Sequence, residues 1–437
     1  MKEKFIRSTI ILLIGGFLTK ILGMLIKIAM TRLMGTEGIG LYMMILPTFT
    51  LFIVLAQMGF PTALSKLIAE EKKSSKKLFF SVIPISIMIN ILLIILIILI
   101  APYLSNNLLH DKRFNYAVIA ISLVIPFTTL SNICRSYFFG KGRMLPHVIS
   151  NIIEDIVRLF LIIIGIPIVM SKGLEYALCY VILTNIISEL TSTVILFLFL
   201  PKKISISKKD LKPSKTYLKE ELSIALPNTA SKLIGSIGYF LEPIILTSSL
   251  LYVGYSNSYI ITEYGIITGY VLPLLLLPSF FTLAISQALL PVVTKLYIDR
   301  NYKETKRKIY QAIYFSLIIG LPITIILIVF PEFFLESIYN TTKGINYLRL
   351  LAPFLLLQYI QSPLAFSLDA MGRSIDNLKA ITLGTIIRTI LLFLLSLLRI
   401  GIVSLLISTI VNILVVTIYN YLQVKKNLYN YQDPGLF

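Results

Sequence analysis

Long apolar runs without a charged side chain are the feature that most limits what this chain can fold into. Such runs span residues 38–65, 78–109, 264–294, 309–331 and 400–424. Each is long enough to cross a bilayer, which takes about 20 apolar residues in a helix. Strands are the poorer interpretation, because barrel spans are short segments of alternating polarity. With 57% hydrophobic and only 14% charged residues, the composition excludes a water-soluble fold.

Charge clusters and turn residues divide the chain into twelve expected helices. Their expected bounds are 8–30, 40–65, 78–104, 115–139, 147–170, 175–200, 220–248, 264–294, 309–330, 346–370, 380–398 and 401–424. We therefore expect an all-α polytopic membrane protein.

Lysine and arginine are divided unevenly between the loops on the two sides. If the N-terminus is cytoplasmic, loops on that side carry 27 basic residues and the opposite loops carry 6. Because cytoplasmic loops are enriched in Lys and Arg, both termini are predicted to lie in the cytoplasm. The net charge of +19 is then mostly a topology signal. It calls for no nucleic-acid partner, and the basic loops are expected to favour anionic membrane lipids.

The chain repeats itself at an offset of about 230 residues. Arg143 and Arg158 are 15 residues apart, as are Arg373 and Arg388, and a glycine precedes the first arginine of each pair. Further matches are Pro126-Phe127 with Pro353-Phe354, Ser65-Lys66-Leu67 with Thr294-Lys295-Leu296, and residues 19–23 with 231–235.

Six helices per copy would give both copies the same orientation in the membrane. We therefore expect two parallel six-helix lobes around a central cavity, residues 1–200 and 220–437. Residues 201–219, with seven lysines, are expected to form a basic cytoplasmic linker.

Seven basic residues fall inside the expected spans, where charge is costly and usually faces a cavity or a partner. They are Lys20, Lys27, Arg135, Arg158, Lys232, Arg349 and Arg388. Lys20 lies about 18 Å into its helix at about 1.5 Å per residue, and Lys232 occupies the matching depth in the seventh helix. Arg135 and Arg349 lie nearer helix ends, from which they could snorkel to the headgroups.

We select Lys20, Lys232, Arg158, Arg388 and Lys27 as candidates for binding an anionic headgroup. Lysine holds phosphate as a point charge and arginine holds it through bidentate contacts. The alternative for Arg158 is structural pairing with Glu154, four residues earlier, and with Asp155.

Acidic residues in the spans are candidates for a different role. Glu242 and Asp369 are candidates for coupling transport to Na⁺ or H⁺, with structural pairing as the alternative. Neither Cys134 and Cys179 nor His110 and His147 have the spacing of a metal site, so no metal or other cofactor is expected.

Two motifs resemble the stage V sporulation protein B family. They are residues 19–70, beginning TKILGMLIKIAMTRLMGTEGIGLY, and residues 140–158, GKGRMLPHVISNIIEDIVR. This family belongs to the multidrug/oligosaccharidyl-lipid/polysaccharide (MOP) exporter superfamily, with the lipid II flippase MurJ and the multidrug and toxin extrusion (MATE) transporters. The resemblance implies alternating access and flipping of a polyprenyl-pyrophosphate-linked saccharide, such as a peptidoglycan precursor, across the bacterial cytoplasmic membrane. It also implies that Lys20 meets the pyrophosphate.

Two other functions compete with this one. A cation-coupled multidrug exporter of the same superfamily should carry the opposite charge in its cavity. A membrane-bound glycosyltransferase needs acidic catalytic residues or a substantial loop outside the membrane, and the longest hydrophilic segment is only about 20 residues. We therefore expect a transporter rather than an enzyme, with no catalytic residue, working as a monomer.

Overall fold

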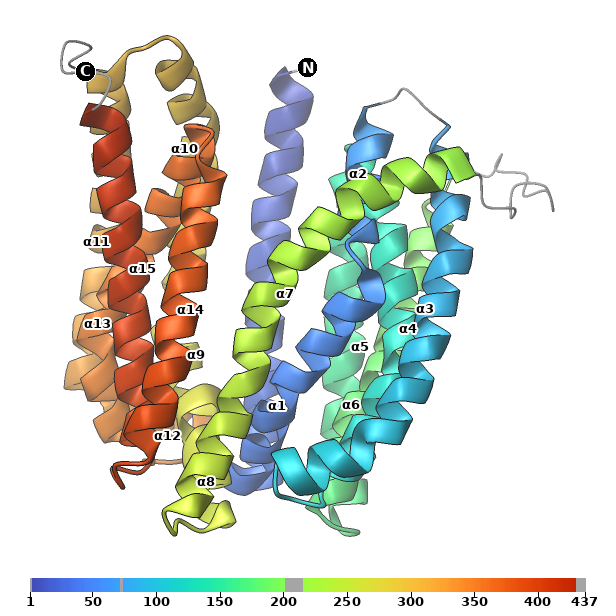
Figure 1. Cartoon of the computed structure of the whole chain (residues 1–437), viewed down its shortest axis with the longest axis vertical. Coiled ribbons are helices and arrows are strands. Elements are labelled where there is room, and N and C mark those ends of the chain that lie inside the picture. Colours follow the sequence, from blue (N-terminus) through green and yellow to red (C-terminus); the bar gives the residue numbers. More distant parts are fainter. Residues whose placement is uncertain (1, 71–73, 201–214, 430–437) are drawn as a thin grey trace. The chain divides into compact units, whose positions relative to one another are not determined.

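The structure is a computed structural model that describes residues 2–70, 74–200 and 215–429. Within those ranges the chain forms helices and turns, and no strand (Figure 1). Eleven of these helices are long and apolar enough to cross a membrane. The fold is therefore that of an all-α, multi-pass membrane protein, as the apolar runs predict.

Fifteen α-helices follow one another along the described part of the chain. They are α1 (Lys2–Gln57), α2 (Phe60–Ala69), α3 (Ser75–Tyr103), α4 (Phe114–Gly140), α5 (Met144–Met170), α6 (Leu174–Leu198), α7 (Lys215–Tyr252), α8 (Asn257–Gly265), α9 (Leu272–Leu275), α10 (Ser279–Ile298), α11 (Tyr302–Val329), α12 (Pro331–Tyr339), α13 (Ile345–Ala370), α14 (Ser374–Ser396) and α15 (Val403–Tyr429). Two π-helical stretches, η1 (Leu104–Leu108) and η2 (Ile266–Val271), extend α3 and join α8 to α9.

The first two expected spans meet at a sharp kink inside α1. Gly35 has φ of 70° and ψ of −174°, a non-helical conformation that glycine adopts at little cost. Figure 1 shows the chain running away from the N-terminus and returning after this point. Arg113, in the loop before α4, holds the kink by an ion pair of 2.8 Å with Glu37 and one of 2.7 Å with Asp111. The hydrogen bonds to Asp111 raise the pKa of Arg113 above its ordinary value.

Two expected helices are interrupted where glycine or proline stands. The expected span 40–65 breaks before α2, because Gly59 adopts φ of 67° and Pro61 occupies the first turn of the new helix. The expected span 264–294 breaks between α9 and α10, and Pro278 directly precedes α10. Proline lacks the N–H that would continue the preceding helix, which accounts for this break.

The chain divides into two compact units, Met1–Ile244 and Ile245–Phe437. The first unit holds α1 to α6 and most of α7. Glu221, near the start of α7, is buried and accepts hydrogen bonds of 2.8 and 2.9 Å from Ser81 of α3. The expected linker, 201–219, lies largely outside the described residues, and α7 begins within its last part.

Both units pack their helices in the same order. In the first unit α3 packs on α4, α4 on α6 and α5 on α6, while in the second α11 packs on α13, α13 on α15 and α14 on α15. Helices α3 to α6 therefore pack on one another in the same scheme as α11, α13, α14 and α15.

The turns after α4 and α13 also match. Gly142 and Gly372 have φ of 65° and 73°, the left-handed conformation that closes a helix. In the first copy the Arg143 N–H donates to the Phe138 carbonyl over 3.0 Å, and the equivalent bond in the second copy measures 2.8 Å. The repeated Gly-Arg pair is thus a helix-ending turn in both units.

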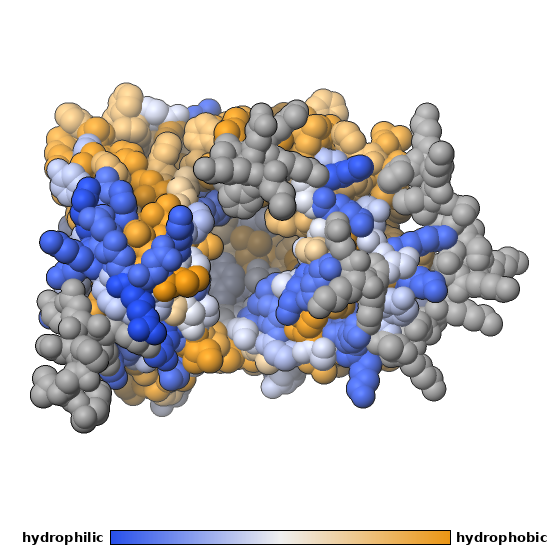
Figure 2. Space-filling model, turned by 90° about the horizontal axis from the view of Figure 1, so that it is seen from above, coloured by the Kyte–Doolittle hydropathy of each residue, from blue (hydrophilic) through white to orange (hydrophobic). Residues whose placement is uncertain are grey.

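Hydrophobic side chains cover the flanks of the helices. Leu99 on α3 and Leu198 on α6 are 72% and 79% exposed, as expected for residues that face lipid. Figure 2, which views the molecule along the helices, shows hydrophilic side chains gathered on the end face and hydrophobic ones around its margin. The pattern fits helices that cross a bilayer and end at its surface.

Candidate functional site

Charged side chains from three neighbouring helices meet inside the first unit. They are Arg135 on α4, Glu154, Asp155 and Arg158 on α5, and Glu189 on α6. The three acidic and basic residues of α5 also explain why this 27-residue helix is not among the eleven uniformly apolar ones.

Arg135 connects α5 to α6. It forms an ion pair with Glu154, and its Nη2 lies 3.1 Å from Glu189 Oε2. It also donates a hydrogen bond of 2.8 Å to Ser192. The three charged side chains are only 7–12% exposed. Arg135 is therefore a buried partner of two carboxylates and does not snorkel to the membrane surface.

Arg158 is occupied by carboxylates of its own helix. Its Nη2 lies 2.5 Å from Glu154 Oε1, its Nη1 lies 3.5 Å from Asp155 Oδ1, and it donates to Ser188 over 3.3 Å. The cluster as a whole holds three carboxyl groups and two guanidinium groups. It therefore offers no surplus of positive charge to an anion, and its contacts are those of the structural alternative.

The three candidate lysines differ from these arginines. Lys20 and Lys27 lie on α1 seven residues apart, which places them two turns apart on one face. Lys232 lies on α7 within the first unit. Lys20 and Lys232 are exposed and Lys27 is half-buried. In the portion of the chain that the structure describes, none of the three has a carboxylate within ion-pair distance.

Arg388, on α14 of the second unit, has different surroundings from its repeat partner Arg158. Its Nη2 donates a long hydrogen bond of 3.4 Å to Thr409 on α15. At the offset of 230 residues, Gly384 and Thr385 stand where Glu154 and Asp155 stand in the first copy. The second copy thus keeps the arginine without acids at the two matching positions.

The two candidate coupling residues lie in unlike places. Glu242 is 5% exposed inside α7. Asp369 is exposed and is the penultimate residue of α13. Among the described residues, no three His, Cys, Asp or Glu side chains gather in a way that would hold a metal ion.

Sequence reasoning singled out Glu154 and Arg158 but missed the part that Arg135 and Glu189 play. These two residues are 54 positions apart on different helices. The available signal was their type, because an arginine and a glutamate inside apolar spans each need a partner.

Repeated helical units with cations inside their spans define a membrane transporter fold. The structure matches that of an inward-facing multidrug resistance MATE family transporter of the MOP superfamily with a TM-score of 0.77. The match covers 96% of both chains at 17% sequence identity.

The chain belongs to the polysaccharide biosynthesis protein family, whose model matches residues 5–297. The MatE family model matches residues 236–398. Stage V sporulation protein B of Bacillus subtilis (strain 168) is 32% identical over 405 residues, covering 90% of this chain and 78% of that protein. Lipid II flippase MurJ of the same organism is 22% identical over 436 residues, covering 90% and 77%. These matches confirm the resemblance drawn from residues 19–70 and 140–158.

Proposed function

We propose that the chain is a flippase that carries a polyprenyl-pyrophosphate-linked saccharide, such as a peptidoglycan precursor, across the bacterial cytoplasmic membrane by alternating access. Membership of the polysaccharide biosynthesis protein family supports the class of cargo. The flippase named among the relatives supports transport of a lipid-linked molecule. In this proposal both termini lie in the cytoplasm, and the protein breaks no bond of its cargo.

The observation that carries the proposal is the contrast between the lysines in the spans and the two arginines in the spans of the first unit. Arg135 and Arg158 are neutralised by carboxylates, whereas Lys20, Lys27 and Lys232 have none within ion-pair distance among the described residues. A cation in a membrane span without an acidic partner calls for an anionic ligand or a water-filled cavity. A pyrophosphate supplies the required charge, and a lysine ammonium binds it as a compact point charge.

The same contrast weighs against the multidrug exporter. The likeness to a MATE transporter is a likeness of fold at 17% identity. An exporter of organic cations needs carboxylates that are free to meet its cargo. The acids Glu154, Asp155 and Glu189 are instead engaged by Arg135 and Arg158. We therefore assign Lys20, Lys27 and Lys232 to the headgroup, and give Arg158 the role of shaping the first unit.

Replacing the lysines tests the assignment in cells. We expect Lys20→Ala and Lys232→Ala to abolish complementation of a flippase-deficient strain, because the pyrophosphate loses its counter-charge. Lys20→Arg, which keeps the charge, should retain part of the activity. The matched control is Lys172→Ala, which removes an exposed loop lysine. Immunoblots of membrane fractions should show equal levels of all variants, and full complementation by both alanine variants would remove the cationic site from the proposal.

A further inference from the structure

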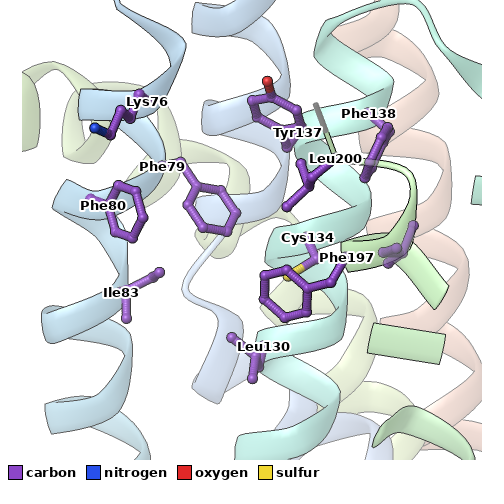
Figure 3. Close-up of a pocket in the computed structure, with 11 residues that line it drawn as sticks. Lys76, Phe79, Phe80, Ile83, Leu130, Cys134, Tyr137, Phe138, Phe197 and Leu200 are labelled. Atoms are coloured by element: carbon purple, nitrogen blue, oxygen red, sulfur yellow. The ribbon is translucent and has the colours of Figure 1, made fainter. Parts of the chain in front are cut away.

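A cavity of about 170 Å³ lies within the first unit, between α3, α4 and α6 (Figure 3). Eleven side chains surround it, and Lys76 is the one charged residue among them. Phe79 and Tyr137 form part of the wall, with ring centroids 6.0 Å apart in an edge-to-face arrangement. The space is therefore apolar, with aromatic walls.

The volume and the lining suit hydrocarbon better than water. A cavity of about 150 Å³ lined by Leu, Ile and Phe stays dry and takes up benzene, whereas a buried water needs two to four polar partners. By that measure this cavity holds about six carbon atoms of a hydrocarbon chain.

The cavity opens on the outer flank of α6. Phe197 lines it and is 48% exposed, and Leu198, the next residue, is 79% exposed. Exposed leucine and phenylalanine on a membrane-spanning helix face lipid. A lipid chain can therefore enter from the side without leaving the bilayer.

Lys76 marks the end of the cavity at the membrane surface. It is the second residue of α3, and in Figure 3 it lies at one end of the lining while Ile83 and Leu130 lie at the other. The exposed Lys77 and Lys141 occupy the adjoining ends of α3 and α4. Several lysines at the point where a span meets the headgroups attract anionic lipids.

The second unit has a lysine at the position that matches Lys76, but the cavity beside that lysine is much smaller. At the offset of 230 residues, Lys306 and Leu364 stand where Lys76 and Cys134 stand. They line a cavity of only about 10 Å³, to which Tyr421 contributes. Leucine in place of cysteine and the added tyrosine ring leave room for about one water at most. The lysine thus belongs to the repeated fold, whereas the space beside it is much smaller in the second unit than in the first.

We propose that this cavity binds an acyl chain of an anionic phospholipid from the cytoplasmic leaflet, with the phosphate at Lys76. The chain fills the space among Phe79, Leu130 and Phe197, and the headgroup stays at the surface. A lipid held in this way contacts α3, α4 and α6 together, and so joins three helices of the first unit.

The protein contains no tryptophan, so one introduced tryptophan reports on this site alone. Phe197→Trp places the reporter at the cavity mouth, and Leu198→Trp places a matched control on the adjacent lipid-facing position. The full-length chain is reconstituted in phosphatidylcholine vesicles that contain a minor fraction of phosphatidylglycerol brominated on its acyl chains. Bromine quenches tryptophan fluorescence on contact.

We expect brominated phosphatidylglycerol to quench Phe197→Trp about fivefold more effectively than brominated phosphatidylcholine, the preference that one lysine near the surface provides. Leu198→Trp should show no comparable preference. Adding Lys76→Ala to the reporter should abolish the preference. Adding Leu130→Phe, which fills the cavity, should lower quenching by both lipids.

Three results would overturn the proposal. Equal lipid preference at the two reporter positions would mean that the cavity selects nothing. A preference that survives Lys76→Ala would place the headgroup elsewhere. Relief of quenching by unbrominated polyprenyl phosphate, but not by unbrominated phosphatidylglycerol, would assign the cavity to a polyprenyl chain.

Discussion

Arg135 is the residue on which two buried glutamates of the first unit depend. Replacing it with methionine would leave Glu154 and Glu189 close together with one guanidinium fewer. Removing one partner of a buried pair costs about 3–5 kcal/mol, because the remaining charge is left uncompensated. We expect Arg135→Met to lower the melting temperature of the purified protein strongly, measured by thermal unfolding in detergent.

The pairing itself is tested by a second replacement and a control. Arg135→Met combined with Glu189→Gln should recover part of the lost stability, because the second change removes the unpaired carboxylate. Arg349→Met should change little, since Arg349 is exposed and makes only a 3.4 Å bond to the Ile328 carbonyl. A melting temperature of Arg135→Met equal to that of the unaltered protein would contradict the buried cluster.

The spacing of residues predicted the contact of Glu154 with Arg158 in this cluster, but not the contact of Arg135 with Glu189. Glu154 and Arg158 lie one helical turn apart, so their contact follows from helix geometry alone. The contact of Arg135 with Glu189 depends on which faces α4 and α6 turn toward each other. With apolar residues on every side of these helices, the sequence carries little information about that rotation.

At the scale of the elements, glycine determines where helices begin and end. Gly59 and Gly142 both have left-handed φ angles, but their surroundings differ. A Cβ on Gly59 would lie 2.4 Å from the Ala225 carbonyl oxygen of α7, whereas one on Gly142 would meet nothing within 4 Å. The close approach of α7 therefore depends on Gly59.

This difference gives a matched pair of substitutions. Gly142→Ala should cost about 1–2 kcal/mol, the backbone penalty of the left-handed conformation alone. Gly59→Ala should cost more, because α7 must also move away from α2. The melting temperatures of the two purified variants test whether Gly59→Ala is the more destabilising change. Equal melting temperatures would mean that α7 does not pack against Gly59 as described.

The sequence predicted which runs of the chain form apolar helices better than the continuity of those helices. Uncharged runs identify a span by its length and hydropathy, and the structure forms helices along these runs. The break before α10 was missed because Pro278 lies within an apolar run, where proline can either kink a helix or end it. Packing with neighbouring helices decides between these outcomes.

At the scale of the whole molecule, the two units keep one packing scheme and differ in chemistry. The first unit contains the buried charged cluster and the apolar cavity beside Lys76. At the corresponding level the second unit uses neutral contacts, such as the hydrogen bond of 2.9 Å between Gln361 and Thr417. Transport of an asymmetric cargo, with a charged headgroup and a long apolar tail, is compatible with such unequal halves.

Reconstituted transport tests the proposed function most directly. The purified chain is placed in vesicles with a labelled polyprenyl-pyrophosphate saccharide, and exposure of the sugar at the opposite leaflet is followed with an impermeant reagent. We predict rapid exposure with the unaltered protein and slow exposure with Lys20→Ala and Lys232→Ala. Exposure no faster than in protein-free vesicles, for lipid II and for a second polyprenyl-linked sugar alike, would contradict the flippase.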